Sequence, residues 1–112
     1  MIVLVCGGRT YNDYVTFEQC MNMLPFKPSA IVHGGAKGAD SLADTYAKIK
    51  GIPVIRVDAL WNYHGNKAGI LRNQSMLDFI NIGYVVAFPG GTGTGDMIRR
   101  SKAKQLPVWE IL

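Results

Sequence analysis

The chain alternates short apolar runs with amphipathic stretches. The apolar runs predict five strands, at residues 2–6, 30–33, 53–57, 84–88 and 107–111. Between them, hydrophobic residues recur at helical spacing, as Tyr14, Phe17 and Met21 do in the first stretch. Such alternation is typical of a parallel sheet covered by helices on both faces. We therefore expect one α/β domain with a doubly wound sheet in the strand order 3-2-1-4-5.

Four helices are expected, one in each gap between the strands. The first begins near residues 12–13, and the second runs from about residue 40 to a stop at Gly51. The third covers about residues 68–80, and the fourth ends near Lys104. Each carries apolar residues at helical spacing, which indicates that one side of each helix packs on the sheet.

The longest stretch without a periodic pattern precedes the third helix. Residues 58–67 are aromatic and polar, and they exceed the length that a connection between a strand and a helix requires. We expect an irregular loop with a function, since long loops often carry one. The helix that follows is predicted to turn Ile70, Met76 and Leu77 toward the sheet.

Composition narrows the class of protein. With 112 residues, 48% of them hydrophobic, the chain can bury a core without a metal or a disulfide. Cys6 and Cys20 lack the spacing of zinc or redox sites, so we expect buried thiols, no metal and no cofactor. No apolar run approaches the ~18 residues of a membrane span, and Met1 leads directly into a strand. We expect a cytoplasmic protein that does not bind membranes.

Three glycine-rich segments follow the first, second and fourth strands. They read Gly7-Gly8-Arg9, Gly34-Gly35-Ala36-Lys37-Gly38-Ala39-Asp40 and Pro89-Gly90-Gly91-Thr92-Gly93-Thr94-Gly95-Asp96. In a doubly wound sheet the carboxyl ends of the first and fourth strands flank a crevice, so the three segments should converge there. The third has glycines that allow close approach and two threonine hydroxyls near a helix start, which indicates a phosphate-binding loop. A tight turn that needs glycine only for its geometry is the alternative.

Two common phosphate motifs are excluded. The turn after the first strand is not G-x-G-x-x-G, and Lys37 is followed by Gly38 rather than by Ser or Thr. We therefore expect neither NAD binding by that fingerprint nor ATP hydrolysis by a P-loop.

Several charged and polar side chains are candidates for the site, each with a structural alternative. The guanidinium of Arg72 can bind a phosphate bidentately, and Arg9 lies beside the first glycines, but either can form a surface ion pair instead. Asp40 and Asp96 can bind a ribose or act as acid or base, or they can cap backbone N–H groups. Asn73 can hydrogen-bond a base or sugar, or fix the neighbouring loop.

Aromatic residues in the long loop offer a stacking surface. Trp61, Tyr63 and His64 can stack on a base, which contributes roughly 1–3 kcal/mol per base in nucleic-acid complexes. Alternatively, Trp61 can pack against the third helix.

The charge pattern raises a second class of partner. The net charge is +4, and Arg99, Arg100, Lys102 and Lys104 lie close together on the last predicted helix. This cluster can bind nucleic acid, although a solvated helix face explains it more simply.

The motifs together resemble those of the SLOG superfamily, which includes the LOG phosphoribohydrolases and the DNA-processing protein DprA. The three glycine segments, Trp61 with Gly65, and Ala68-Gly69-x-x-Arg72-Asn73-x-x-Met76 appear in that superfamily's order. The chain is most similar to its small single-domain YspA-like branch. The resemblance covers nearly the whole chain.

The resemblance implies a single Rossmann-like domain over residues 1–112 that binds a nucleotide or nucleotide-derived ligand. A nucleoside monophosphate, an ADP-ribose-like molecule or a cyclic nucleotide would then be sensed or sequestered, with its phosphate at the second and third glycine segments. Many relatives self-associate, so a homo-oligomer is an open expectation, whereas nucleic-acid binding is the weaker alternative. The predicted ligand-binding residues are Gly7, Gly8, Arg9, Gly34, Gly35, Ala36, Lys37, Gly38, Asp40, Trp61, Arg72, Asn73, Pro89, Gly90, Gly91, Thr92, Gly93 and Thr94.

The resemblance also implies an alternative activity. In LOG enzymes the last loop reads P-G-G-x-G-T-x-x-E, and its glutamate, with an arginine, is associated with cleavage of the N-glycosidic bond of a nucleoside monophosphate. Here Met97 occupies the glutamate position, and Asp96 stands one residue earlier, about 100° round a helix. If the protein is such a hydrolase, Arg72 and Asp96 are the candidate catalytic residues.

Overall fold

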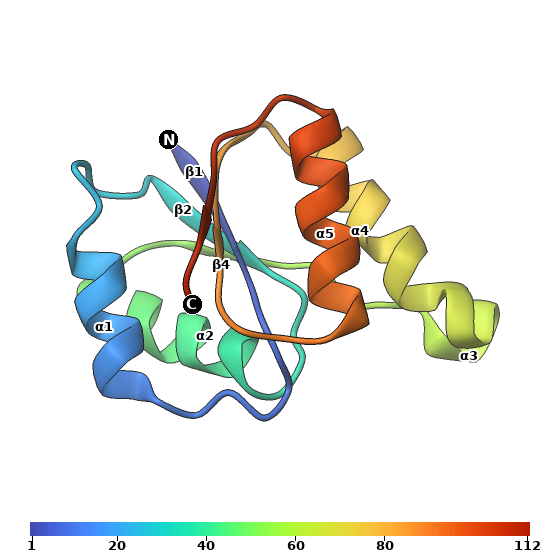
Figure 1. The fold of residues 1–112 in the computed structure, drawn as a ribbon, viewed down its shortest axis with the longest axis horizontal. Helices are drawn as coiled ribbons and strands as arrows, with labels where there is room; N and C mark the ends of the chain where they lie inside the picture. Colours follow the sequence, from blue (N-terminus) through green and yellow to red (C-terminus); the bar gives the residue numbers. More distant parts are fainter.

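A five-stranded, all-parallel sheet runs through the molecule in the order β3-β2-β1-β4-β5 (Figure 1). The computed structural model describes the backbone of residues 1–112 and every side chain except those of residues 63 and 66. The strands are β1 (Ile2–Cys6), β2 (Ala30–His33), β3 (Val54–Arg56), β4 (Ile82–Ala87) and β5 (Val108–Glu110). The predicted α/β class and strand order are confirmed.

Helices cover both faces of the sheet (Figure 1). On one face, α1 (Tyr14–Asn22) and α2 (Ala39–Lys50) pack on the sheet through an apolar cluster that includes Phe17. On the other face, α4 (Ala68–Phe79) and α5 (Thr92–Ala103) pack on it through a second cluster that includes Met97. Alternate residues of β1 enter opposite clusters, as the twofold side-chain period of a strand requires.

Local signals in the sequence explain where the helices on the first face begin and end. The Asp13 carboxylate caps α1, because its Oδ1 accepts the backbone N–H of Thr16 at 3.1 Å. Gly51 ends α2 in the left-handed conformation, with φ +68°.

The segment predicted to be irregular contains two short helical elements. Residues 61–67 form α3 (Trp61–His64) and a 3-10 turn, η1 (Gly65–Lys67). A single helical turn is too short to produce a periodic pattern, so the pattern gave no sign of it. The loop expected over residues 58–67 is therefore corrected to a short connection followed by this helical segment.

Two further expectations about burial are corrected. Ile70 is 46% exposed, because the first turn of α4 faces a cavity rather than the sheet, while Met76 and Leu77 are buried as predicted. Cys6 and Cys20 are free thiols that are half-buried rather than buried. None of the helices in the described residues combines the length and the apolar character that crossing a membrane requires.

Candidate functional site

The three glycine segments are joined through the backbone of Gly8. Its N–H donates to the carbonyl of Pro89 at 2.8 Å, and its carbonyl accepts the N–H of Ala39 at 3.1 Å. A Cβ on Gly8 would lie only 2.9 Å from the Pro89 carbonyl oxygen and 3.1 Å from the Cα of Gly90. Glycine is therefore required where these segments pack backbone against backbone.

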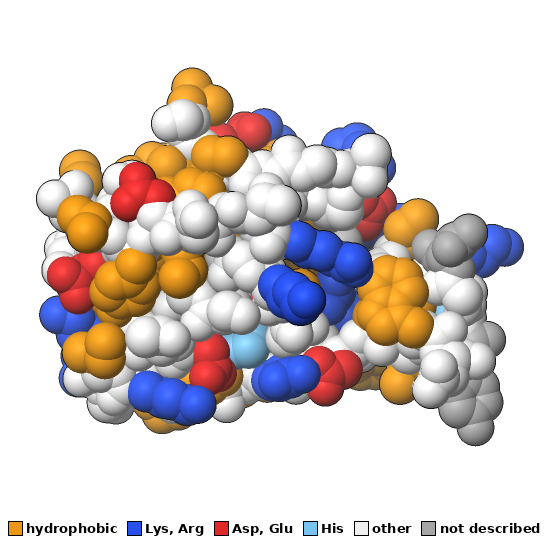
Figure 2. Space-filling model, turned by 90° about the horizontal axis from the view of Figure 1, so that it is seen from below, with side chains coloured by type: hydrophobic (Ala, Val, Ile, Leu, Met, Phe, Trp, Pro, Cys, Tyr) orange, Lys and Arg blue, Asp and Glu red, His pale blue; other side chains and the backbone are white. Residues whose placement is uncertain are grey.

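A cavity of about 780 Å³ opens beside this junction, at the carboxyl ends of β1 and β4. Its volume lies within the range of small-molecule sites, roughly 300–1,000 Å³. Figure 2 views this edge of the sheet and shows Lys and Arg side chains gathered next to a hydrophobic one. The cavity is lined by Cys6, Gly7, Gly8, Arg9, Ala36, Asp40, Trp61, Gly69, Ile70, Arg72, Asn73, Gly91, Thr92, Gly93, Thr94, Gly95, Asp96, Met97 and Arg99.

One wall of the cavity is the N-terminus of α5, which Gly91 precedes. The backbone N–H groups of Thr92, Gly93 and Thr94 have no acceptor among the described residues, and the first turn holds no acidic side chain. A Cβ on Gly91, Gly93 or Gly95 would meet nothing within 4 Å. The wall thus presents unpaired amides and the positive end of the helix dipole, with open space at its three glycines.

The second glycine segment binds its own carboxylate. Oδ2 of Asp40 accepts the N–H groups of Gly34 and Ala36, each at 3.1 Å, while Gly35 donates to Nδ1 of His33 at 2.9 Å. Burial raises the pKa of Asp40 above its usual value, although the Ala36 hydrogen bond and the charge of Arg72 oppose that rise. Of the two readings of Asp40, the structure shows that its carboxylate caps backbone amides.

Arg72 reaches this wall from α4. Its Nη1 donates to the carbonyls of Gly34, at 2.9 Å, and Val57, at 3.3 Å, and its Nε donates to Oδ1 of Asn73 at 3.1 Å. A methyl group on Gly34 would collide with the guanidinium. Burial lowers the pKa of Arg72, and the charges of Asp40 and Asp58 oppose that change. Only Nη2 has no partner among the described residues, so most of the expected bidentate fork is already used.

Asp96 lies in an ion-pair network on the opposite wall. It is 6% exposed and accepts hydrogen bonds from Asn73, Arg99 and Arg100, at distances from 2.9 to 3.2 Å. Burial alone would raise the pKa of Asp96, but the hydrogen bonds of Asn73 and Arg100 and the two arginine charges outweigh burial and lower it. Asp96 is therefore a charged acceptor rather than a proton donor. Met97, the next residue along α5, is buried.

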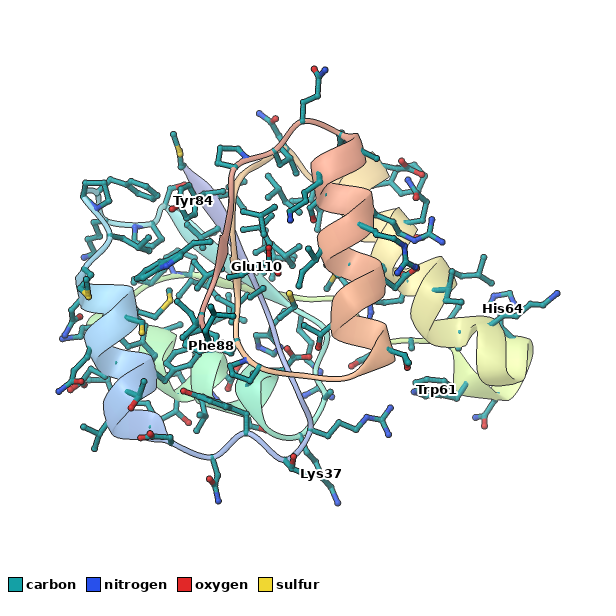
Figure 3. The ribbon with its side chains drawn as sticks, viewed as in Figure 1. Lys37, Trp61, His64, Tyr84, Phe88 and Glu110 are labelled. Atoms are coloured by element: carbon teal, nitrogen blue, oxygen red, sulfur yellow. The ribbon has the colours of Figure 1, made fainter. Side chains whose placement is uncertain are left out.

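Trp61 and Arg9 meet across the mouth of the cavity. The Cζ atom of Arg9 lies 5.6 Å from the centre of the Trp61 ring, within cation–π range, and Trp61 is 48% exposed. The edge of the ring also lies 3.5 Å from the point where a Cβ on Gly69 would stand, so Trp61 packs against α4, as the structural alternative expects, and leaves about half of its surface exposed. Figure 3 shows Trp61 beside the loop that leads into α5, and His64 farther out on α3.

Some predicted site residues lie outside the cavity lining. Lys37 is exposed and points outward at the bottom of Figure 3, and the side chain of Tyr63 lies outside the described part of the structure. Gly34 packs against Arg72, and Gly90 packs against Thr94 and Gly8. The predicted ligand-binding residues that do not line the cavity are Gly34, Gly35, Lys37, Gly38, Pro89 and Gly90.

Several lining residues were not predicted to bind ligand: Cys6, Gly69, Ile70, Gly95, Met97 and Arg99. Their positions offer a signal, because Cys6 ends β1 immediately before a glycine segment, and Gly69 and Ile70 form the first turn of α4. Burial raises the pKa of the Cys6 thiol to about 12, with the charge of Asp40 adding to the rise. The thiol is thus neutral, and the cavity floor carries no thiolate.

A Rossmann-like sheet with a cavity at its switch point defines the class of this protein, and comparison with known proteins narrows it. The model of the YspA, cpYpsA-related SLOG family matches residues 1–64. The chain is also 36% identical to the Gene 61 protein of Mycobacterium phage D29, over 95% of this chain and 92% of that relative. The protein therefore belongs to the YspA, cpYpsA-related SLOG family. No solved structure matches significantly. Membership suggests a nucleotide-related ligand.

Proposed function

We propose that the protein binds a nucleotide or nucleotide-derived ligand in this cavity and acts as a sensor or a sequestering protein. The ligand classes are nucleoside monophosphates, ADP-ribose-like molecules and cyclic nucleotides. The observation that carries the proposal is the wall formed by α5. Three unpaired amides, at Thr92, Gly93 and Thr94, face a cavity that Arg72 also lines. Such a helix terminus favours an anionic group.

The energetics indicate that the phosphate alone does not suffice. A micromolar ligand requires about 8 kcal/mol of binding free energy, whereas a charge at one helix terminus contributes ~0.3–1 kcal/mol, or at best ~2 kcal/mol. The free Nη2 of Arg72 and a base stacked on Trp61 would supply further contributions. A ligand with both an anion and a flat base therefore suits this site better than phosphate alone.

The geometry favours α5 over the second glycine segment as the phosphate site. In that second segment the Asp40 carboxylate already accepts hydrogen bonds from two backbone amides, and the His33 ring accepts one from a third. An incoming phosphate would have to displace a buried carboxylate and would meet its negative charge. At α5 no such competitor exists among the described side chains, since Asp96 is held by two arginines.

Binding without cleavage is favoured over N-glycosidic hydrolysis. Cleavage needs a group that can protonate the departing base or activate water. Asp96 has a lowered pKa and is engaged by Asn73 and Arg100, while Met97 has no acidic proton to offer. Chromatography of a bound nucleoside monophosphate for released free base distinguishes the two activities. Release of base would make Arg72 and Asp96 the first residues to test as catalytic.

Nucleic-acid binding is less favoured, because most of the basic cluster is engaged within the protein. Arg100 pairs with Asp96, Lys102 pairs with Glu110, and Lys104 donates to the Leu77 carbonyl. These side chains do not form a free basic stripe. Steeply salt-dependent retention of single-stranded DNA would nevertheless indicate such a role.

A thermal-shift and mass-spectrometry screen tests the proposal against the three ligand classes. A ligand at 100 times its Kd should add about 2.7 kcal/mol to the free energy of unfolding, which raises Tm by several degrees. Arg72→Ala and Gly91→Val should both weaken binding, the first by removing a cation and the second by filling the cavity. Arg56→Ala removes another hydrogen-bonded arginine, outside the cavity lining, and is the matched control. Absence of any shift, or unchanged binding in both cavity variants, would refute the proposal.

A further inference from the structure

Asn73 is buried where α4 meets the first turn of α5, and its side-chain amide is engaged on both sides. Its Oδ1 accepts from Nε of Arg72 at 3.1 Å. Its Nδ2 donates to the carbonyl of Gly93 at 3.2 Å and to Oδ2 of Asp96 at 3.0 Å. Both amide hydrogens are used, so this group has no donor left for a ligand.

The partners determine the orientation of that amide. A guanidinium nitrogen can only donate, whereas a backbone carbonyl and a carboxylate can only accept. The oxygen of Asn73 must therefore face Arg72, and the nitrogen must face Gly93 and Asp96. A carboxylate at position 73 would match only Arg72, because it would oppose the charge of Asp96 and leave the Gly93 carbonyl without its donor.

These bonds connect the two parts of the proposed anion site. Arg72 is held on one side by the Gly34 and Val57 carbonyls and on the other by Asn73, which leaves Nη2 as its free nitrogen. Through Gly93, Asn73 also ties the first turn of α5 to α4. The same side chain thus orients the guanidinium and the unpaired amides of the helix.

We propose that Asn73 is a positioning residue that aligns Arg72 with the N-terminal amides of α5, so that both bind one anionic group. This inference rests on the proposed function. Asn73 itself does not bind the anion. It acts by arranging, before the ligand arrives, groups that would otherwise have to be ordered during binding.

An exchange of the donor and the acceptor tests this role. In Asn73→Asp, the hydrogen bond to Asp96 becomes a repulsion between two carboxylates. In the double variant Asn73→Asp/Asp96→Asn, the amide at position 96 can donate to the carboxylate at position 73, which still accepts from Arg72. If position 73 required only a side chain of this size, the second substitution would not restore phosphate binding.

The probe is inorganic phosphate, titrated into the ¹⁵N-labelled protein while the backbone amide signals of Thr92, Gly93 and Thr94 are followed by NMR. Asn73→Asp should raise the Kd for phosphate about tenfold or more. The double variant should recover part of the lost affinity, because the amide at position 96 donates to the carboxylate at position 73 while the Gly93 carbonyl stays without its donor. Asn73→Ala, which removes the bonds without adding a charge, should weaken binding by a smaller factor. Gln19→Ala removes an exposed side-chain amide on α1, outside the cavity lining, and should leave the Kd nearly unchanged.

Three outcomes would overturn the inference: wild-type affinity in Asn73→Ala, a double variant no better than the single one, or no binding of phosphate to the wild-type protein. If Asn73→Asp does not fold, as judged by circular dichroism, Asn73→Ala and the double variant still decide. The nucleotide screen is separate. Nucleotide binding without phosphate binding would refute the role of Asn73 and leave the proposed function standing.

Discussion

Two glycine segments border the same cavity, and they use their backbone amides in opposite ways. In residues 34–38, the amides of Gly34, Gly35 and Ala36 are bound by Asp40 and His33. At the start of α5, the amides of residues 92–94 have no acceptor among the described residues. The first segment already contains its anion, whereas the amides at the start of the second remain unpaired among the described residues.

The glycines of the two segments differ in the same way. Gly38 has φ +76°, and a Cβ there would collide with the Gly8 carbonyl, so the fold requires glycine. Gly91, Gly93 and Gly95 have negative φ and open space where a Cβ would stand. Glycine density alone therefore does not identify a ligand site. What distinguishes the two segments is whether the absent side chain would meet protein or cavity.

The largest effect is expected where glycine is required by the fold. Gly38→Ala should lower the free energy of unfolding by about 3–5 kcal/mol, because strain at positive φ adds to a backbone collision. Gly93→Ala is the matched control and should change stability by less than about 1 kcal/mol. Chemical denaturation of both variants measures the difference. Equal destabilisation would remove the distinction between the two segments.

Removal of the internal anion should have the next largest effect. Asp40→Ala leaves the N–H groups of Gly34 and Ala36 without an acceptor, which should cost about 2–3 kcal/mol of stability at pH 7. The vacated loop should then bind an external anion, so phosphate should stabilise this variant more than the wild-type protein. Thermal unfolding with and without phosphate measures this. If Asp40→Ala is as stable as the wild-type protein and phosphate does not stabilise it further, the role given to Asp40 is wrong.

The two buried carboxylates should also respond to pH with opposite signs. The folded state lowers the pKa of Asp96, so its ion pairs stabilise the fold at neutral pH and are lost as pH falls below about 4. Asp96→Asn should therefore cost about 1 kcal/mol at pH 7 and progressively less under acid conditions. Burial raises the pKa of Asp40, so its contribution falls as pH rises above about 4. Denaturation of Asp96→Asn and Asp40→Asn from pH 3 to pH 7 tests both signs. Parallel profiles would refute the contrast.

The architecture could be predicted from the sequence because its strands and long helices follow local patterns of apolar and polar residues. Apolar runs and amphipathic stretches alternate, and the parallel order places β1 and β4 at the switch point, as the pairing of Val5 with Val86 shows. The helical turn at residues 61–64 was missed because four residues carry no periodicity. Ile70 was misplaced because periodicity describes a helix face but not where the sheet beneath it ends.

The interior of the site was only partly predictable. The i,i+3 and i,i+4 spacing of Asp96 to Arg99 and Arg100 is visible in the sequence and is enough to predict their pairing. The bond from Asn73 to Asp96 joins two helices, so no local pattern shows it. The role of Asn73 stayed open for the same reason, whereas that of Asp40 depends on how its own glycine segment turns back onto the carboxylate. Hydrogen-bond partners that are distant in sequence are decided by packing.

The smallest expected effect gives the sharpest test of why the α5 segment keeps its glycines. Gly95 lies inside the helix with open space around its Cα, so Gly95→Ala should raise stability by about 0.5–1 kcal/mol. The added methyl group enters the cavity and should weaken ligand binding in the thermal-shift screen. Thr45→Ala, on the exposed side of α2, should stabilise the protein comparably without affecting binding. If Gly95→Ala is more stable and binds ligand as well as the wild-type protein, open space at this helix start has no role in recognition. If stability rises while affinity falls, the glycine is retained for the ligand, at the expense of the helix.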